Sequence, residues 1–267
     1  MQAESLGYRT DLMLARLQGA VVADRGEYLV VRTPGNPTFH WGNYVLADRS
    51  WLDRRLADLV AVFHTEHPRS PHLAIGVDGV DGRVWDEDEV VECGLEVDRS
   101  VVMTAKRVLA PGRPNPHAVC RILDVDKAAD WEAAVNLHAL EHHDFDAPEF
   151  RNFVQRRMDV RREQQLAGLG GWFGAFMDGQ MVSGLGLFTD GSGLGRFQDV
   201  ETLASARRLG LASTLVHRAS IAGFRHFGIR DLVMVADPDD TAIRIYRSLG
   251  FADSELQVQL ARPMPAA

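Results

Sequence analysis

The sequence predicts an α/β chain of two domains, each a mixed, mostly antiparallel sheet flanked by helices. Three observations support this: the 267-residue length, a proline-rich segment near the middle, and strand and helix periodicities that recur in the same order on both sides of it. At about 150 residues per domain, the length favours two domains. Residues 111–117 contain three prolines, which fit neither a helix interior nor a central strand. We therefore predict domains at 1–110 and 118–267, joined by a linker at 111–117.

Alternating and helical periodicities place the elements of the second block. In chain order they are a strand at 118–123, helices at 127–141 and 148–167, strands at 172–177, 181–188 and 196–203, a helix at 210–227, a strand at 232–236, a short helix at 241–249 and a strand at 255–261. Asp178-Gly179 is a typical tight-hairpin dipeptide, and Gly250 a typical helix C-terminus.

The first block repeats the later part of this order when it is aligned with a shift of about 156 residues. The matched segments are 44–46 with 200–202, the helix at 51–64 with the helix after Arg207, 73–77 with 232–235, Gly94-Leu95 with Gly250-Phe251, and 101–105 with 257–261. Any strand resembles another strand, but five elements in one order favour an internal duplication. We expect residues 20–107 to form a second mixed sheet.

Composition excludes several function classes. Lys and Arg total 29 against 37 Asp and Glu, a net charge of −8, so neither nucleic acid nor a membrane surface is an expected partner. No apolar run approaches the roughly 20 residues of a membrane span, and the first ten residues lack the pattern of a secretory signal. Cys93 and Cys120 are too few for a disulfide scaffold or a cysteine-built zinc site. We expect a cytoplasmic protein.

The richest chemistry lies where the strand ending near Thr202 leads into a helix. A helix N-terminus offers free N–H groups and a positive dipole end, which suit a phosphate or pyrophosphate. Gly210 and Ala212 would let such an anion approach the backbone, and Arg207 and Arg208 would add charge-assisted bonds. The same residues also fit a surface loop whose arginines precede an amphipathic helix.

Two motifs here resemble signatures of the Gcn5-related N-acetyltransferases. Arg207-x-x-Gly210-x-Ala212, after a Val-x-Thr strand, is similar to the family's acetyl-coenzyme A loop, Arg/Gln-x-x-Gly-x-Gly/Ala. About 30 residues later, Ala242-x-x-x-Tyr246-x-x-x-Gly250-Phe251 resembles the second signature. The order of elements over 118–262 matches too. The first block lacks the loop, so the resemblance implies two domains of this fold, the N-terminal one reduced and without cofactor.

The resemblance implies an N-acetyltransferase that moves an acetyl group from acetyl-coenzyme A to a small-molecule or peptide amine, by direct attack in a ternary complex. The strand of Val200, Glu201 and Thr202 would pair with the pantetheine arm. Tyr246 would protonate the departing thiolate, although a core tyrosine is the alternative. Asp239 stands where many members have Asn, so the resemblance implies a cofactor-binding position there; an Asp can cap the next helix but cannot donate as an amide does. The implied pyrophosphate loop consists of Arg207, Arg208, Leu209, Gly210, Leu211, Ala212 and Ser213.

Glu201 is the candidate general base. Strand alternation puts its side chain opposite those of Val200 and Thr202, although a solvated strand carboxylate is an equal alternative. The segment Glu141-His142-His143-Asp144 lies where the family lines its acceptor side, and an acidic, histidine-rich rim would suit a basic amine; a polar surface loop would look the same. The acceptor, the acyl length and the choice between monomer and homodimer stay open.

Two other functions compete with acetyl transfer. The chain could bind acyl-coenzyme A as a sensor or serve a structural role, since one half already lacks the loop. His138, Glu141 and His142 also fit the His-x-x-Glu-His pattern of inverted zinc peptidases. No third ligand is suggested nearby, so we predict no metal. Gly191-x-Gly193-x-Gly195 joins two strands and opens no helix, which favours a hairpin connection over a nucleotide loop.

Overall fold

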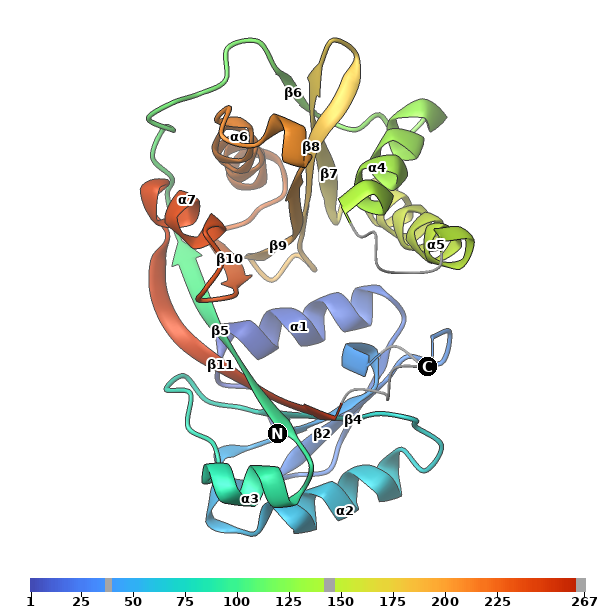
Figure 1. Cartoon of the computed structure of the whole chain (residues 1–267), viewed down its shortest axis with the longest axis vertical. Helices are drawn as coiled ribbons and strands as arrows, with labels where there is room; N and C mark the ends of the chain where they lie inside the picture. The colour runs from blue at the N-terminus through green and yellow to red at the C-terminus, as the bar shows by residue number, and fades with distance from the viewer. Residues whose placement is uncertain (37–39, 142–146, 263–267) are drawn as a thin grey trace. The chain divides into compact units, whose positions relative to one another are not determined.

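The structure is a computed structural model that describes residues 1–36, 40–141 and 147–262. The chain forms two compact units that do not follow chain order (Figure 1). Unit 1 holds residues 1–103 and 235–240 and the chain from 253 on, and unit 2 holds residues 104–234 and 241–252. In both units a mostly antiparallel sheet is flanked by helices, which confirms the predicted fold class.

Unit 1 contains the first five strands and the last strand of the chain. Its strands are β1 (Val21–Asp24), β2 (Tyr28–Arg32), β3 (Tyr44–Ala47), β4 (Leu73–Val77), β5 (Glu96–Ala105) and β11 (Ala252–Arg262), in the order β1-β2-β3-β4-β11-β5. β3 and β4 are parallel, whereas β11 pairs antiparallel with β4, from Val258 opposite Val77 to Arg262 opposite Leu73. The C-terminal strand thus completes the sheet of the N-terminal block.

Helices cover both faces of the unit 1 sheet because its central strands are apolar on both faces. These helices are α1 (Leu6–Leu17), η1 (His40–Gly42), η2 (Arg49–Asp53), α2 (Leu56–Glu66) and α3 (Glu87–Glu92). Tyr8 and Leu12 of α1 pack with Leu46, while Leu59 of α2 packs with the neighbouring residue Val45 on the other face. The helix expected at 51–64 is divided, because the chain is extended at Arg54 and Arg55.

Unit 2 contains the elements predicted from residue 118 onward, except the last strand. Its strands are β6 (Val119–Ile122), β7 (Gly170–Met177), β8 (Gln180–Phe188), β9 (Leu194–Thr202) and β10 (Asp231–Ala236), in the order β10-β9-β8-β7-β6. Its helices are α4 (Ala128–Glu141), α5 (Ala147–Leu166), η3 (Ala204–Ala206), α6 (Leu211–His226) and α7 (Ala242–Ser248). Asp178 and Gly179 join β7 to β8 with positive φ values of 48° and 81°, the tight turn predicted from this dipeptide.

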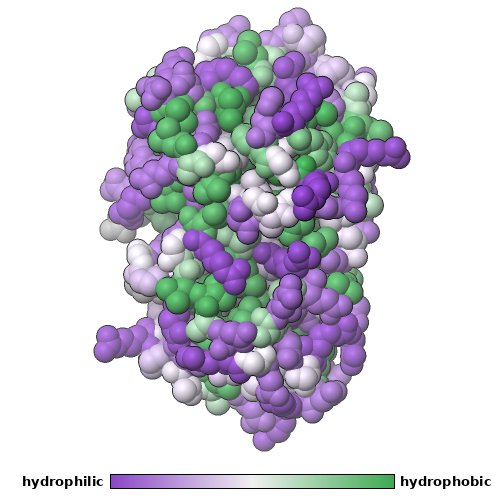
Figure 2. Space-filling view, turned by 180° about the vertical axis from the view of Figure 1, so that it is seen from behind, coloured by the Kyte–Doolittle hydropathy of each residue, from purple (hydrophilic) through white to green (hydrophobic). Residues whose placement is uncertain are grey.

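Alternation along β8 separates the helices of unit 2. A Cβ on Gly184 would meet Leu137 of α4, whereas Leu187 meets Gly223 of α6. The pair α4 and α5 therefore covers one face and α6 the other. Within the described residues no helix is long and apolar enough to cross a membrane. On the surface drawn in Figure 2, hydrophilic side chains are interspersed among smaller hydrophobic areas.

Candidate active site

The two parallel strands of unit 2 separate partway along their length. β9 and β10 pair from Leu194 opposite Asp231 to Arg196 opposite Val233. β9 then continues to Thr202, and within the described residues this second half of β9 has no partner on the β10 side. An unpaired strand edge in the middle of a sheet can accept an extended ligand by strand addition.

A β-bulge coincides with this separation. Gly184 of β8 pairs with Glu201, and Gly186 pairs with Gln198, so Asp199 and Val200 together stand opposite Leu185. Asp199 has a φ of 49°, which is uncommon for a residue other than glycine. A bulge bends its strand and raises the local twist, which directs β9 away from β10.

A partly buried ion pair from α5 holds the bulge. Arg157 Nη2 lies 2.7 Å from the Asp199 carboxylate. Burial alone would raise the pKa of Asp199, but Arg157, Arg161 and His138 together lower it below its ordinary value. Burial and the neighbouring Arg157 lower the pKa of Arg161 to about 10, so it too stays charged at neutral pH. The bulge is therefore anchored by charge as well as by the strand.

Glu201 follows the bulge, and its side chain lies on the α4 face. Its carboxylate Oε1 contacts Nδ1 of His138, which projects from α4. Both side chains are largely buried, 6% exposed for His138 and 13% for Glu201. On the opposite face, the Thr202 hydroxyl lies 2.8 Å from that of Ser183. Glu201 is therefore a paired carboxylate rather than a solvated one.

The segment after β9 exposes backbone donors. Arg208 and Gly210 have positive φ values of 65° and 74°, and Gly210 is the N-cap of α6. Thr214 is the first residue of the helix whose N–H is bonded, to Gly210 O at 3.1 Å. Among the described residues, the N–H groups of 208–213 have no acceptor. Such a run of donors at a helix N-terminus is an anion-binding arrangement.

The two arginines of this loop differ. Arg207 Nε donates to Thr202 O at 3.1 Å and so ties the loop to the end of β9. Arg208 is exposed and forms no ion pair with any described residue. Of the two, Arg208 is the one available to a bound anion.

Gly210 packs closely against the proline-rich segment. A Cβ there would lie 2.1 Å from Arg113 O in the proline-rich segment, and Asn115 from the same segment donates to Leu209 O. The glycine is thus required by its positive φ and by close backbone packing. Any substitution at Gly210 would disturb the fold as well as a ligand.

Tyr246 lies on α7 and is 5% exposed. Its ring meets Phe251 edge-on at 6.4 Å between centroids, and Phe251 in turn meets Phe197 of β9 at 6.0 Å. The tyrosine is therefore linked by aromatic packing to the strand whose edge is open. Asp239 does not cap α7, because the N-cap residue is Thr241 and no side-chain capping bond forms.

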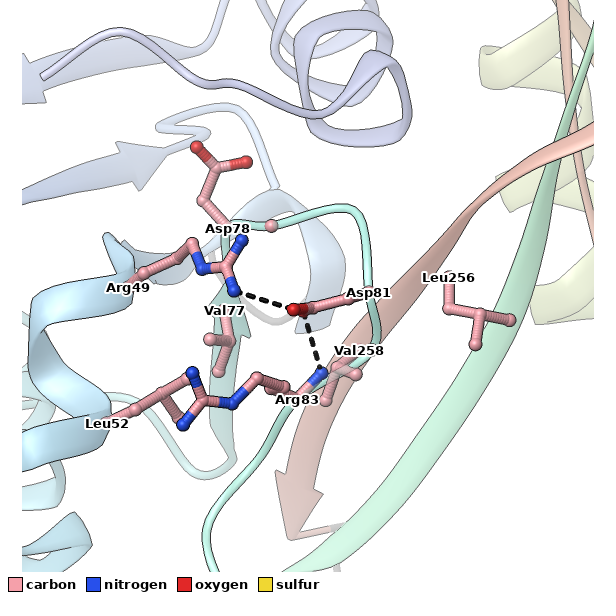
Figure 3. Close-up of a pocket in the computed structure, with 10 residues that line it drawn as sticks. Arg49, Leu52, Val77, Asp78, Asp81, Arg83, Leu256 and Val258 are labelled. Carbon is pink, nitrogen blue, oxygen red and sulfur yellow. Dashed lines mark hydrogen bonds and ion pairs between the residues drawn. The ribbon is translucent and has the colours of Figure 1, made fainter.

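The matching region of unit 1 is closed. β3 pairs with β4 to its last residue, Ala47, whose carbonyl also accepts from Asp78 N at 2.8 Å. At the start of α2, the N–H of Leu56 donates to Glu89 Oε1 at 2.6 Å. Arg49 and Asp81 form an ion pair at 2.6 Å in the pocket drawn in Figure 3. An internal carboxylate and an ion pair thus occupy positions that unit 2 leaves open.

The proposed zinc pattern is only partly described. His138 faces Glu201, while His142, His143 and Asp144 lie outside the described residues, as does the side chain of Glu141. Over the described ranges no group of three possible metal-ligating side chains is present. The contact between His138 and Glu201 was not predicted, because no local pattern links two residues 63 positions apart on different elements.

Residues 131–251 match the family model described as Acetyltransferase (GNAT) family. No curated relative matches the chain. Among solved structures, a GCN5-related N-acetyltransferase from Kribbella flavida shares 20% identity, with a TM-score of 0.65 over 98% of this chain and 97% of that one. A tandem GNAT protein from the clavulanic acid biosynthesis pathway shares 14% identity, with a TM-score of 0.56 over 90% and 83%. A conserved protein of unknown function from Staphylococcus epidermidis shares 13% identity, with a TM-score of 0.69 over 91% and 93%.

Proposed function

Since the chain contains a domain of the GNAT acetyltransferase family at residues 131–251, we propose that it moves an acetyl group from acetyl-coenzyme A to an amine acceptor. The family implies acyl transfer from an acyl-coenzyme A. The observation that carries the proposal is the open edge of β9 followed at once by the unbonded N–H groups of 208–213. A coenzyme A molecule has an extended amide-containing arm joined to a pyrophosphate, which fits this sequence of features.

The second half of β9 would bind the pantetheine arm through its main chain, at Val200, Glu201 and Thr202. The N–H groups of residues 208–213 would bind the pyrophosphate, with Arg208 adding charge. Such contacts hold the thioester in one place and orientation. The entropy of positioning is then lost on binding and no longer adds to the activation barrier. The carboxylate of Asp239 has no amide to donate, so we assign it no bond to the ligand.

Glu201 and Tyr246 are the proposed acid–base residues. Glu201 would accept a proton from the ammonium form of the acceptor, which frees the nitrogen lone pair to attack the thioester carbonyl carbon. The carbon–sulfur bond then breaks, and the Tyr246 hydroxyl would donate a proton to the leaving thiolate. The nitrogen loses its second proton as the amide forms, which would restore the hydroxyl. The acceptor is a small-molecule or peptide amine.

The test is release of coenzyme A thiol from acetyl-coenzyme A in the presence of a panel of primary amines. The loop assignment is tested with Ala212→Glu, which places a carboxylate on the first turn of α6. A negative charge there favours the helix dipole, so the fold should persist while the affinity for coenzyme A falls by about 10-fold or more. Ala212→Gln is the matched control for size and should bind far more tightly than the glutamate variant.

Three results would contradict the proposal. Equal coenzyme A affinity in the glutamate and glutamine variants would remove the loop assignment. Tight binding without turnover across the whole panel would favour the acyl-coenzyme A sensor. Stoichiometric zinc by elemental analysis, with hydrolysis in place of transfer, would favour the His138, Glu141 and His142 alternative.

A further inference from the structure

We propose that His138 is a positioning residue for Glu201, donating a hydrogen bond from its imidazole Nδ1 to one carboxylate oxygen and thereby fixing the orientation in which the carboxylate meets the acceptor. This inference rests on the proposed function, because it assumes that Glu201 is the base. It adds a residue from α4, an element outside both sequence signatures.

The imidazole is held in place on two sides. Its Nδ1 contacts Glu201 Oε1, and its ring is stacked on Phe150 of α5, with 6.0 Å between centroids and 21° between the planes. With only 6% of its side chain exposed, His138 has little rotamer freedom. A donor that is itself fixed can fix its acceptor, which a mobile surface side chain cannot do.

Among the described residues, Glu201 is the carboxylate that contacts His138. On β9, Asp199 is paired with Arg157 of α5. Arg161 of α5 is fully buried, donates to Gln164 at 3.0 Å and to Gln198 at 3.2 Å, and lies over the Phe188 ring. Asp199 and Arg161 thus each have side-chain partners on α5 or β9. His138 contributes to the lowered pKa of Asp199, but its direct contact is with the Glu201 carboxylate.

In the proposed step, one proton moves from the acceptor ammonium to the Glu201 carboxylate, and the nitrogen lone pair forms the new bond to the carbonyl carbon. The bond from that carbon to sulfur breaks, and its electron pair leaves on sulfur, which takes the proton of the Tyr246 hydroxyl. The second proton leaves the nitrogen as the amide forms and restores the hydroxyl. His138 neither gains nor loses a proton in this step. Its contribution is to keep the carboxylate from rotating away from the ammonium.

Two substitutions separate positioning from packing. His138→Phe keeps a ring against Phe150 but removes the donor, whereas His138→Asn places an amide N–H near the position of Nδ1. A misplaced reacting group typically costs about 100-fold, so kcat should fall about 10- to 100-fold in His138→Phe with an unchanged Kd for acetyl-coenzyme A. His138→Asn should recover most of the loss. Circular dichroism and thermal unfolding would establish that both variants are folded.

A double-mutant cycle completes the test. In a Glu201→Gln background, His138→Phe should cause no further loss of kcat, because the two residues act as a unit. Additive losses, or failure of His138→Asn to exceed His138→Phe, would overturn the proposal. Full activity of Glu201→Gln would instead remove the base assignment on which it rests. If Glu201→Gln lowers kcat but His138→Phe does not, the positioning role of His138 alone would be removed.

A spectroscopic readout is independent of turnover. With histidine labelled with nitrogen-15, the wild-type protein should show a downfield proton attached to Nδ1 of His138. This signal should be absent in His138→Phe and should move in Glu201→Gln, which weakens the acceptor. A signal unaffected by Glu201→Gln would contradict the hydrogen bond itself.

Discussion

Tyr246 carries the leaving-group half of the proposed chemistry. Tyr246→Phe keeps the ring that packs against Phe251 and removes only the hydroxyl. General acid catalysis typically raises a rate by about 100- to 10,000-fold. A thiolate of pKa about 8 to 9 is already a tolerable leaving group, so we expect kcat of Tyr246→Phe to fall by about 100-fold, at the lower end of that range. The Kd for acetyl-coenzyme A, measured by calorimetry, should barely change. A loss below about threefold, with chemistry shown to limit the rate, would reassign Tyr246 to the core.

His67 makes the stability of unit 1 depend on pH. Its ring is buried against Phe63, 4.8 Å between centroids, and burial followed by the charge of Arg32 lowers its pKa from 6.5 to about 4. As pH falls, the unfolded chain therefore takes up this proton before the folded one does. The contribution is fully present above about pH 6.5 and is lost as pH falls toward 4, with an upper bound of about 3 kcal/mol.

The check is denaturant unfolding of the wild type and of His67→Leu between pH 7 and 4. Carboxylates titrate in both proteins, so the difference between the two stability curves isolates His67. We expect that difference to change by about 1–3 kcal/mol over this window. Parallel curves would mean that His67 takes up its proton over the same pH range in the folded and the unfolded chain.

At individual residues, sequence reasoning succeeded where the cause was local. Asp178 and Gly179 form the predicted turn, because positive φ is a property of the dipeptide itself. The reason for Gly210 could not be predicted, since it depends on the carbonyl of Arg113 almost 100 residues earlier. The partner of Glu201 was missed for the same reason. The catalytic and ligand-binding roles of these residues stay predictions.

At the scale of elements, the two parallel strand pairs differ in one respect. β3 and β4 stay paired to the last residue of β3, whereas β9 runs past its last pair with β10. The sequence predicted all four strands, but periodicity reports only which residues face a core. It does not report whether neighbouring strands separate, and here that depends on a bulge anchored by a partly buried ion pair.

This difference predicts one coenzyme A per chain. In unit 1 the N–H of Leu56 is already bonded to Glu89, and Arg49 is paired with Asp81, so an incoming anion would have to displace both carboxylates. Titration calorimetry should give a stoichiometry near one. The variant Ala212→Glu should weaken that single event, and no second binding event should become visible. Two sites, or a site that survives Ala212→Glu unchanged, would show that unit 1 binds as well.

At the scale of the whole molecule, the two compact units are not continuous stretches of the chain. The boundary predicted at 111–117 follows the prolines, yet residues 235–240 and the chain from 253 on group with unit 1. The predicted strand at 255–261 exists, but its partner is β4. One apolar strand can pair with many others, so a sequence without long-range information cannot choose between them. Helix α1 was not predicted, although Ser5 caps it and its apolar residues face the sheet.

β11 should therefore stabilise the N-terminal block rather than the domain that precedes it in the chain. Glu255 accepts from the N–H groups of Leu6 and Gly7 at the start of α1, and Tyr8 donates its hydroxyl proton to Val258 O. Leu260 is fully buried and packs into the core formed with α2. Leu260→Ala would leave a cavity there and should lower the free energy of unfolding by about 2–5 kcal/mol.

Hydrogen exchange locates the effect. In Leu260→Ala, amide protection should fall most in β4 and α2, although both lie more than 180 residues earlier in the sequence. Leu187→Ala is the matched control, because Leu187 is equally buried but packs against α6 in unit 2. Its loss of protection should centre on β8 and α6. If both variants lost protection over the same residues, the two units would unfold together. The division into two units would then not correspond to two independently unfolding parts of the chain.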